Sequence, residues 1–289
     1  VYWVTGEEKF ARFATDIFNV WLVGTYYMNP ILDPGKSCGS SGGWEPGGIC
    51  GYYDYEQIHD DLAMHAAMVY DFAFDYLSRH PHAHLKEIGK DTKSVAVEVF
   101  KRFINIGLVR GGKSGNWNVN GWNMMLRPVL VLDSDEAYPD GKGKEYYLNL
   151  LVNESTPYHD AIPDMLKTYD PVTGLWPESP GYSFGTIQML LDWAAPLKRA
   201  GIDIIAGNPI LQKAAMAVFP WMDDAANMVV FGDSRGGSAN FQTFENLLAY
   251  YAGITDKAGM EKVASALNKG ISQKKYTRNN AGWTGLCTY

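Results

Sequence analysis

Apolar residues recur at helical spacing along most of the chain. From Phe10 to Leu22 they fall three or four positions apart, directly after Thr5-Gly-Glu-Glu8, a sequence that fits a helix capping box. The pattern predicts a long amphipathic helix there, with Phe10, Phe13, Ile17 and Phe18 on one apolar face. Comparable patterns predict further helices over 58–77, 91–108, 119–132, 144–154, 184–199, 209–218, 242–252 and 258–269.

Strand patterns are almost absent from the sequence. The clearest candidate is Met228–Phe231, so a strand or loop segment is expected within 228–240. The many helices show neither a heptad pattern nor a strict repeat, which favours stacked antiparallel helix hairpins that close into an arc or ring. We therefore expect an all-α fold, with residues 1–289 forming one domain.

Three intervening segments, 29–57, 111–123 and 170–185, are rich in Trp, Tyr, Asn and Gly. Exposed aromatic rings stack on the apolar faces of sugars, so the clustering favours a glycan-binding cleft built from loops. The alternative is that each ring covers an end of the helical core. The aromatic candidates for substrate binding are Trp44, Tyr53, Trp117, Trp122 and Trp176.

Composition narrows the range of partners. A formal net charge of -7 argues against a nucleic-acid-binding protein, and the sequence has no apolar run of about 20 residues that would span a membrane. Cys38 and Cys50 flank a Gly-rich loop and are either a disulfide or two free thiols. No metal or cofactor is expected. Because the chain begins at Val1 in a helix entry, we expect that processing or truncation removed what preceded it.

The order of several motifs along the chain resembles that in a known family. Asn116-Trp117 at a helix entry is followed about sixty residues later by Gly174-Leu-Trp-Pro-Glu-Ser-Pro-Gly-Tyr-Ser-Phe-Gly-Thr186, and then by Phe231-Gly-Asp-Ser234. With the opening Tyr2–Ala11 segment, this order resembles the heparinase II/III-type polysaccharide lyases. The resemblance implies an incomplete (α/α) toroid, commonly followed by a β-sandwich. It also implies secretion or a periplasmic location, and β-elimination at a uronic acid of an anionic polysaccharide or oligosaccharide.

The resemblance also assigns roles to single residues. Tyr182 matches a tyrosine that acts as both base and acid, and a free tyrosine titrates near about 10, so it needs a nearby cation or strong donor. Arg127, Arg235 or Lys113 would supply that group. Asn118 and Asn120 are the favoured neutralisers of the uronate carboxylate.

Other residues of the same motifs are assigned as follows. Asn116 more readily bonds the backbone of its turn. Glu178 either positions the tyrosine loop or contacts a sugar hydroxyl. The candidate histidines are His59 and His159, for each of which a structural role is the stronger interpretation. The polar residues expected to bind substrate are Asn116, Asn123, Arg127 and Arg235.

Two other classes of protein compete with this interpretation. An inverting glycoside hydrolase on a related toroid would need two carboxylates about 6.5 to 9.5 Å apart. A non-catalytic glycan-binding solenoid would explain the aromatic loops but not the combination of Asn and Tyr. The carboxylates available for the hydrolase are Glu178, Asp170, Asp133 and Asp233.

Overall fold

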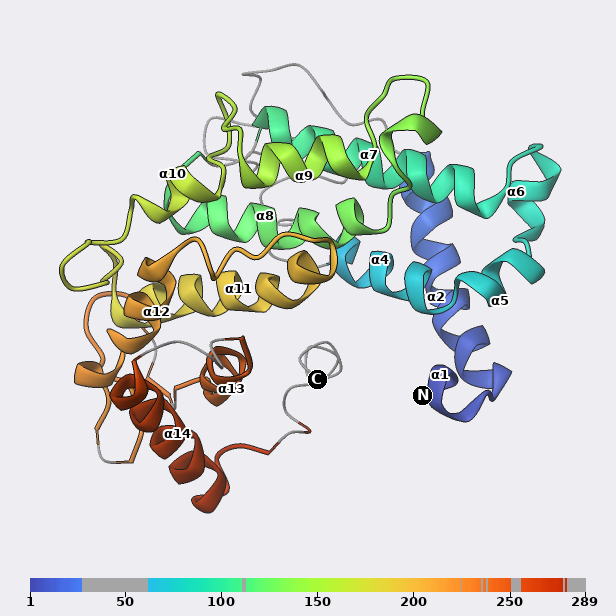
Figure 1. Cartoon of the computed structure of the whole chain (residues 1–289). Coiled ribbons are helices and arrows are strands. Elements are labelled where there is room, and N and C mark those ends of the chain that lie inside the picture. Colours follow the sequence, from blue (N-terminus) through green and yellow to red (C-terminus); the bar gives the residue numbers. More distant parts are fainter. Residues whose placement is uncertain are drawn as a thin grey trace. The chain divides into compact units, whose positions relative to one another are not determined.

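A computed structural model describes residues 1–27, 62–110, 113–223, 225–234, 236–237, 239–250, 256–277 and 279. Helices account for most of these residues, and the same residues contain no strand or sheet (Figure 1). The all-α fold class predicted from the sequence is therefore confirmed. The chain divides into two compact units, Val1–Ile162 and Pro163–Tyr289. The expectations that residues 1–289 form one domain and that the helices form a toroid remain predictions.

The first unit is organised around a central helix, α8 (Gly115–Leu130). This helix packs against α4, α7 and α9, and Figure 1 shows α7, α8 and α9 as neighbouring ribbons. Trp122 of α8 is completely buried together with Phe100 and Ile104. The other helices of the unit are α1 (Tyr2–Thr5), α2 (Glu8–Tyr26), α4 (Leu62–Phe72), α5 (Phe74–Arg79), α6 (Ala83–Glu87), α7 (Thr92–Arg110), η1 (Asp135–Ala137) and α9 (Lys144–Val152).

The second unit is organised around α11 (Pro180–Arg199), which packs against α12 and α13. Its core is aromatic: Trp176, Trp193 and Phe244 are completely or almost completely buried, and the ring of Phe219 stacks on Phe244 at 5.3 Å. Burial of such large side chains is a major contribution to stability. The remaining helices are α10 (Ile162–Leu166), which begins at the boundary, α12 (Pro209–Met216), η2 (Phe219–Trp221), α13 (Phe241–Tyr250) and α14 (Lys257–Ser272).

The predicted strand at Met228–Phe231 is wrong. Only an isolated antiparallel bridge joins Met222 to Met228, and Val229 to Phe231 are about half exposed. A strand needs a continuous ladder of backbone hydrogen bonds with a partner, whereas this segment is joined to Trp221 and Met222 by a single bridge. The predicted capping box also differs from the structure, because Gly6 (φ 70°) ends α1 and Glu7 is the N-cap of α2.

The face that α2 buries matches the predicted one only in part, because some residues of the predicted face are buried and others are exposed. Phe18 and Leu22 are buried with Ala11, whereas Phe13 is 70% exposed and Ile17 is 58% exposed. Apolar residues lie on both sides of this helix, so their spacing alone did not identify the side that packs.

Candidate active site

Tyr182 lies in the first turn of α11, and its side chain is 43% exposed. The sequence starts the helix here because Pro180 occupies its first position, where the missing N–H costs no hydrogen bond and the fixed φ suits a helix. Ser179 precedes it in extended conformation, and its carbonyl accepts from the Ser183 amide at 2.9 Å. The tyrosine is thus presented to solvent from a rigid element.

The segment before this helix is fixed to the core by Trp176. Its indole Nε1 donates to Glu178 Oε2 at 3.0 Å, and its backbone N–H donates to Ser183 Oγ at 3.2 Å. The ring packs edge-on against Tyr169 at 4.8 Å and is only 2% exposed. Trp176 is therefore a buried residue that holds the segment before α11 in place, whereas the sequence predicted that it stacks on substrate.

Glu178 has an altered acidity. Desolvation, joined by the negative charge of Asp233, raises the pKa of Glu178, while the hydrogen bond from Trp176 opposes the shift. Two carboxyl groups therefore lie close enough to influence each other beside the start of α11. Asp170, by contrast, accepts hydrogen bonds from Val172 and Thr173 within its own turn.

A turn formed by residues 231–234 packs against the start of α11. The Gly181 amide donates to Ser234 Oγ at 2.8 Å. Gly232 has a positive φ of 64°, and a Cβ placed on it would lie 3.3 Å from Ser179 Cβ, so glycine permits both the turn and the close approach. The contact with Ser234 was not predicted, although the Phe-Gly-Asp-Ser motif marked this segment.

In the first unit, the Asn-rich segment predicted as a loop is mostly helix. Because α8 begins at Gly115, helical periodicity divides its amides between two faces. Asn118 lies on the buried face with Trp122, one turn further on. The partly exposed residues of these turns are Asn116, Trp117, Asn120 and Asn123.

Asn118 binds the protein itself. Its Nδ2 donates to the Asp160 carbonyl at 2.9 Å and its Oδ1 accepts from the Asp160 amide at 3.1 Å. The Trp122 indole donates to the same carbonyl at 3.1 Å. Asn118 and Trp122 have no exposed surface, whereas the sequence predicted that both contact a sugar. No sequence signal pointed to Asp160 as their partner.

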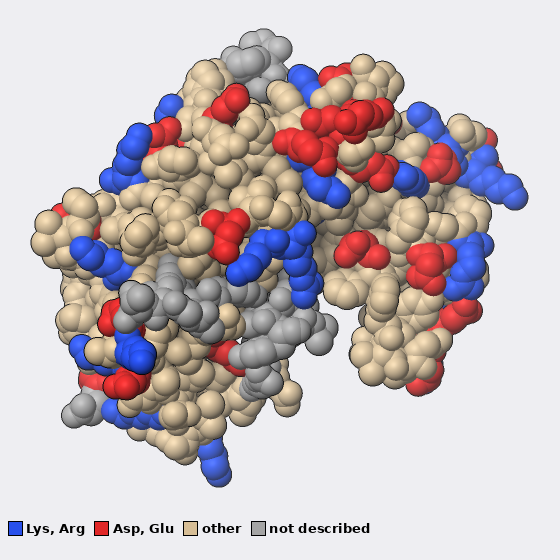
Figure 2. All heavy atoms as spheres, viewed as in Figure 1, with Lys and Arg blue, Asp and Glu red and all other residues tan. Residues whose placement is uncertain are grey.

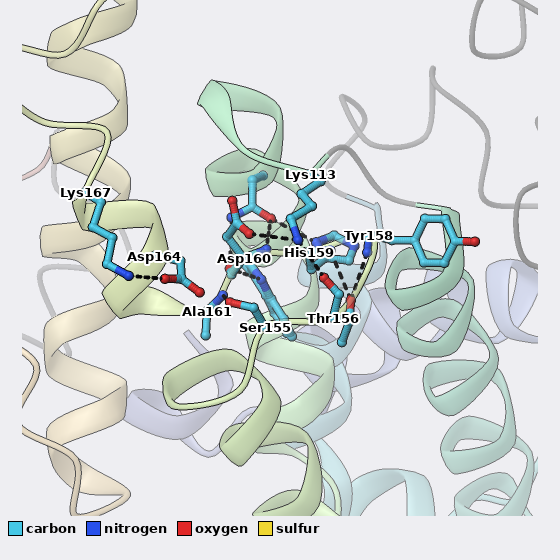
Figure 3. Close-up of polar contacts among 11 residues, drawn as sticks. Lys113, Ser155, Thr156, Tyr158, His159, Asp160, Ala161, Asp164 and Lys167 are labelled. Atoms are coloured by element: carbon cyan, nitrogen blue, oxygen red, sulfur yellow. Dashed lines mark hydrogen bonds and ion pairs between the residues drawn. The ribbon is translucent and has the colours of Figure 1, made fainter.

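His159 lies in the same buried cluster (Figure 3). Its Nε2 donates to the Gly107 carbonyl, and its Nδ1 lies 3.1 Å from Asn118 Oδ1. Two acceptors thus face the ring, but burial opposes the charged form and lowers the pKa of His159 to about 4. Lys113 closes the cluster, 3.5 Å from the Asp160 carboxylate. This environment agrees with a structural role for His159.

The other candidates have these positions. Arg127 is 6% exposed within α8, so its guanidinium is buried rather than presented at the surface. Trp44, Tyr53, His59 and Arg235, together with Cys38 and Cys50, lie outside the described residues. Tyr182 belongs to the second unit, whereas the amides of α8 belong to the first.

On the face shown in Figure 2, Lys and Arg are interspersed with Asp and Glu. Within the described part of the chain, no helix combines the length and the apolar character that crossing a bilayer requires.

Comparison with known proteins gives one informative similarity. The chain is 20% identical over 288 residues to an endo-acting ulvan lyase of Formosa agariphila. The match covers 94% of this chain but 32% of that enzyme, so the chain spans about a third of its length. No protein-family model matches the chain. No solved structure matches it either.

Proposed function

We propose that this protein is a polysaccharide lyase that cleaves a uronic-acid-containing glycan by β-elimination. The similarity to an ulvan lyase along nearly the whole chain supports this class of activity. The proposal depends most on one observation, that Tyr182 is exposed at the start of α11. We further propose that the protein acts outside the cytoplasm, where a polymeric glycan is accessible.

The proposed reaction has three requirements. A base removes the C5 proton of the uronate, the electron pair forms the C4–C5 double bond, and the C4–O bond breaks. The leaving oxygen receives a proton, and the negative charge that develops on the carboxylate must be stabilised. Tyr182 fits the proton-transfer role, because a phenol both accepts and donates a proton and this one is open to solvent.

Stabilisation of the carboxylate requires a hydrogen-bond donor with an accessible surface. Of the two favoured amides, Asn118 has no exposed surface, whereas Asn120 is partly exposed. We therefore assign the proposed role to Asn120 and a structural role to Asn118. Asn116 and Asn123 lie on the same helical face as Asn120 and are the proposed secondary contacts.

An elimination assay tests the proposal directly. The protein is incubated with ulvan, glucuronan, alginate and heparan sulfate, and the products are followed by ultraviolet absorbance. Elimination creates a conjugated 4,5-unsaturated uronate end, which absorbs, while hydrolysis creates reducing ends without it. Absorbing products from at least one polymer are expected. Reducing ends without absorbance would contradict the proposal.

The second candidate function is an inverting glycoside hydrolase. It is favoured by one observation, the raised pKa of Glu178 beside Asp233. A carboxyl group with a raised pKa suits a general acid, and a second carboxylate suits a base that activates water. The same assay separates the two reactions, because only hydrolysis incorporates water without forming a double bond.

A further inference from the structure

Three consecutive apolar side chains are exposed directly before the turn that contacts the start of α11. Phe231 is 51% exposed, and its neighbours Val229 and Val230 are 47% and 56% exposed. Adjacent exposed apolar side chains are a feature of ligand-binding surfaces. We therefore consider what this segment could bind.

The turn that carries Phe231 is fixed relative to Tyr182. The Ser234 hydroxyl accepts from the Gly181 amide, one residue before the tyrosine. On the opposite side of the contact, Gly232 approaches Ser179 so closely that a Cβ would lie 3.3 Å from its side chain. The two segments thus meet through a backbone-to-side-chain hydrogen bond and through the close approach of Gly232 to the Ser179 side chain, which limits their relative movement.

The ring of Phe231 also packs against a second aromatic ring. Trp221 contacts it edge to face at 5.9 Å with an interplanar angle of 83°. The backbone is anchored where the Val229 amide donates to the Trp221 carbonyl at 2.8 Å and the Met228 amide donates to the Gly237 carbonyl at 2.9 Å. The structure therefore holds a flat apolar side chain in place while about half of it stays open.

We propose that Phe231 is a substrate-positioning residue, on which a pyranose ring of the glycan stacks next to the sugar that meets Tyr182. Apolar C–H faces of a pyranose match an aromatic ring, and the stacked sugar covers the surface that water now contacts. This inference rests on the proposed function of Tyr182. It adds a binding subsite to the second unit that depends on apolar contact rather than on charge.

The test compares three substitutions at one position. With ulvan as substrate, Phe231→Ala is expected to raise KM about tenfold while kcat changes less than about threefold, because the stacked sugar binds without reacting. Phe231→Tyr should keep KM near the wild-type value, since it keeps a flat ring. Phe231→Leu preserves apolar volume but not the flat face, and should resemble the Ala variant. Ile271→Ala, which truncates a side chain of 50% exposure on α14, is the matched control.

Direct binding keeps this inference distinguishable from the proposed reaction. Calorimetric titration with ulvan oligosaccharides should show a dissociation constant weakened about tenfold in Phe231→Ala and unchanged in Ile271→Ala. If the wild type forms no unsaturated product but binds, and Phe231→Ala weakens that binding, the lyase proposal fails and the stacking site stands. An unchanged affinity in Phe231→Ala, equal behaviour of the Leu and Tyr variants, or no binding by the wild type would overturn the stacking site.

Discussion

Asn118 holds the backbone of Asp160 through both ends of its amide group. The Nδ2 donates to the Asp160 carbonyl at 2.9 Å and the Oδ1 accepts from the Asp160 N–H at 3.1 Å. The two residues are 42 positions apart in sequence, so the amide ties the segment after α9 to the side of α8. An Asn side chain suits this position because it offers one donor and one acceptor with the geometry of a peptide group.

Removal of this amide should destabilise the first unit. We expect Asn118→Ala to lower the free energy of unfolding by about 1–3 kcal/mol, because the Asp160 amide would lose its acceptor while the Asp160 carbonyl would keep only the Trp122 indole as donor. Urea denaturation followed by circular dichroism measures the change. Asn116→Ala, a partly exposed position on the same helix, is the control and should change stability by less than about 0.5 kcal/mol. Equal effects of the two variants would contradict the structural role of Asn118.

Acidification should act through His159. Its pKa is about 4 in the folded protein against about 6.5 for a free histidine, so between these values the unfolded chain binds more protons. The stability that the neutral ring contributes is complete above pH about 6.5 and is lost as the pH falls towards 4, up to about 3 kcal/mol.

Comparing the wild type with His159→Gln separates the contribution of His159 to the pH dependence of stability from the contribution of the carboxylates. Thermal unfolding at a series of pH values between 7 and 4 should show a steeper loss of stability in the wild type. The variant is expected to be less stable at pH 7 and to approach the wild type near pH 4. Parallel curves would mean that His159 does not titrate differently in the folded protein.

The sequence predicted the helices well where apolar periodicity was strong. The predicted helices over 91–108 and 144–154 correspond closely to α7 and α9. The segment 111–123 was described as a loop rich in Asn and Gly, which are poor helix formers, although its last residues also fell within the helix predicted over 119–132. In the structure, burial of Trp122 and the bonds of Asn118 override that preference, so tertiary contacts decided the conformation.

The candidate site was predictable only in part. The motif around Tyr182 marked a segment that the structure does place at an exposed helix start. The sequence did not reveal that Trp176 and Trp122 are buried, because an aromatic residue in a polar segment is equally compatible with core and surface. The partnership of Gly181 with Ser234 spans 53 positions, and no local pattern specifies a contact at that separation.

Tyr182→Phe tests the proposed proton transfer with a minimal change. The variant keeps the ring and loses the hydroxyl, so we expect the melting temperature to stay within about 2 °C and kcat on ulvan to fall at least about 1000-fold. The formation of unsaturated ends reports the rate. Tyr146→Phe on α9 removes a hydroxyl elsewhere and should leave the rate unchanged. A Tyr182→Phe variant with the wild-type rate would exclude this residue from proton transfer.

Glu178→Gln separates the two candidate reactions at a single residue. The neutral amide still offers an oxygen to the Trp176 indole, and burial disfavours the charged carboxylate, so the variant should be at least as stable as the wild type at pH 7. Glu178→Ala removes the indole's acceptor and should cost about 1 kcal/mol. In a lyase that uses Tyr182, Glu178 only positions its loop, and Glu178→Gln should lower kcat less than about tenfold. A hydrolase that uses Glu178 as its general acid would lose about 100-fold to 10,000-fold, and a loss of that size with an intact fold would favour hydrolysis over elimination.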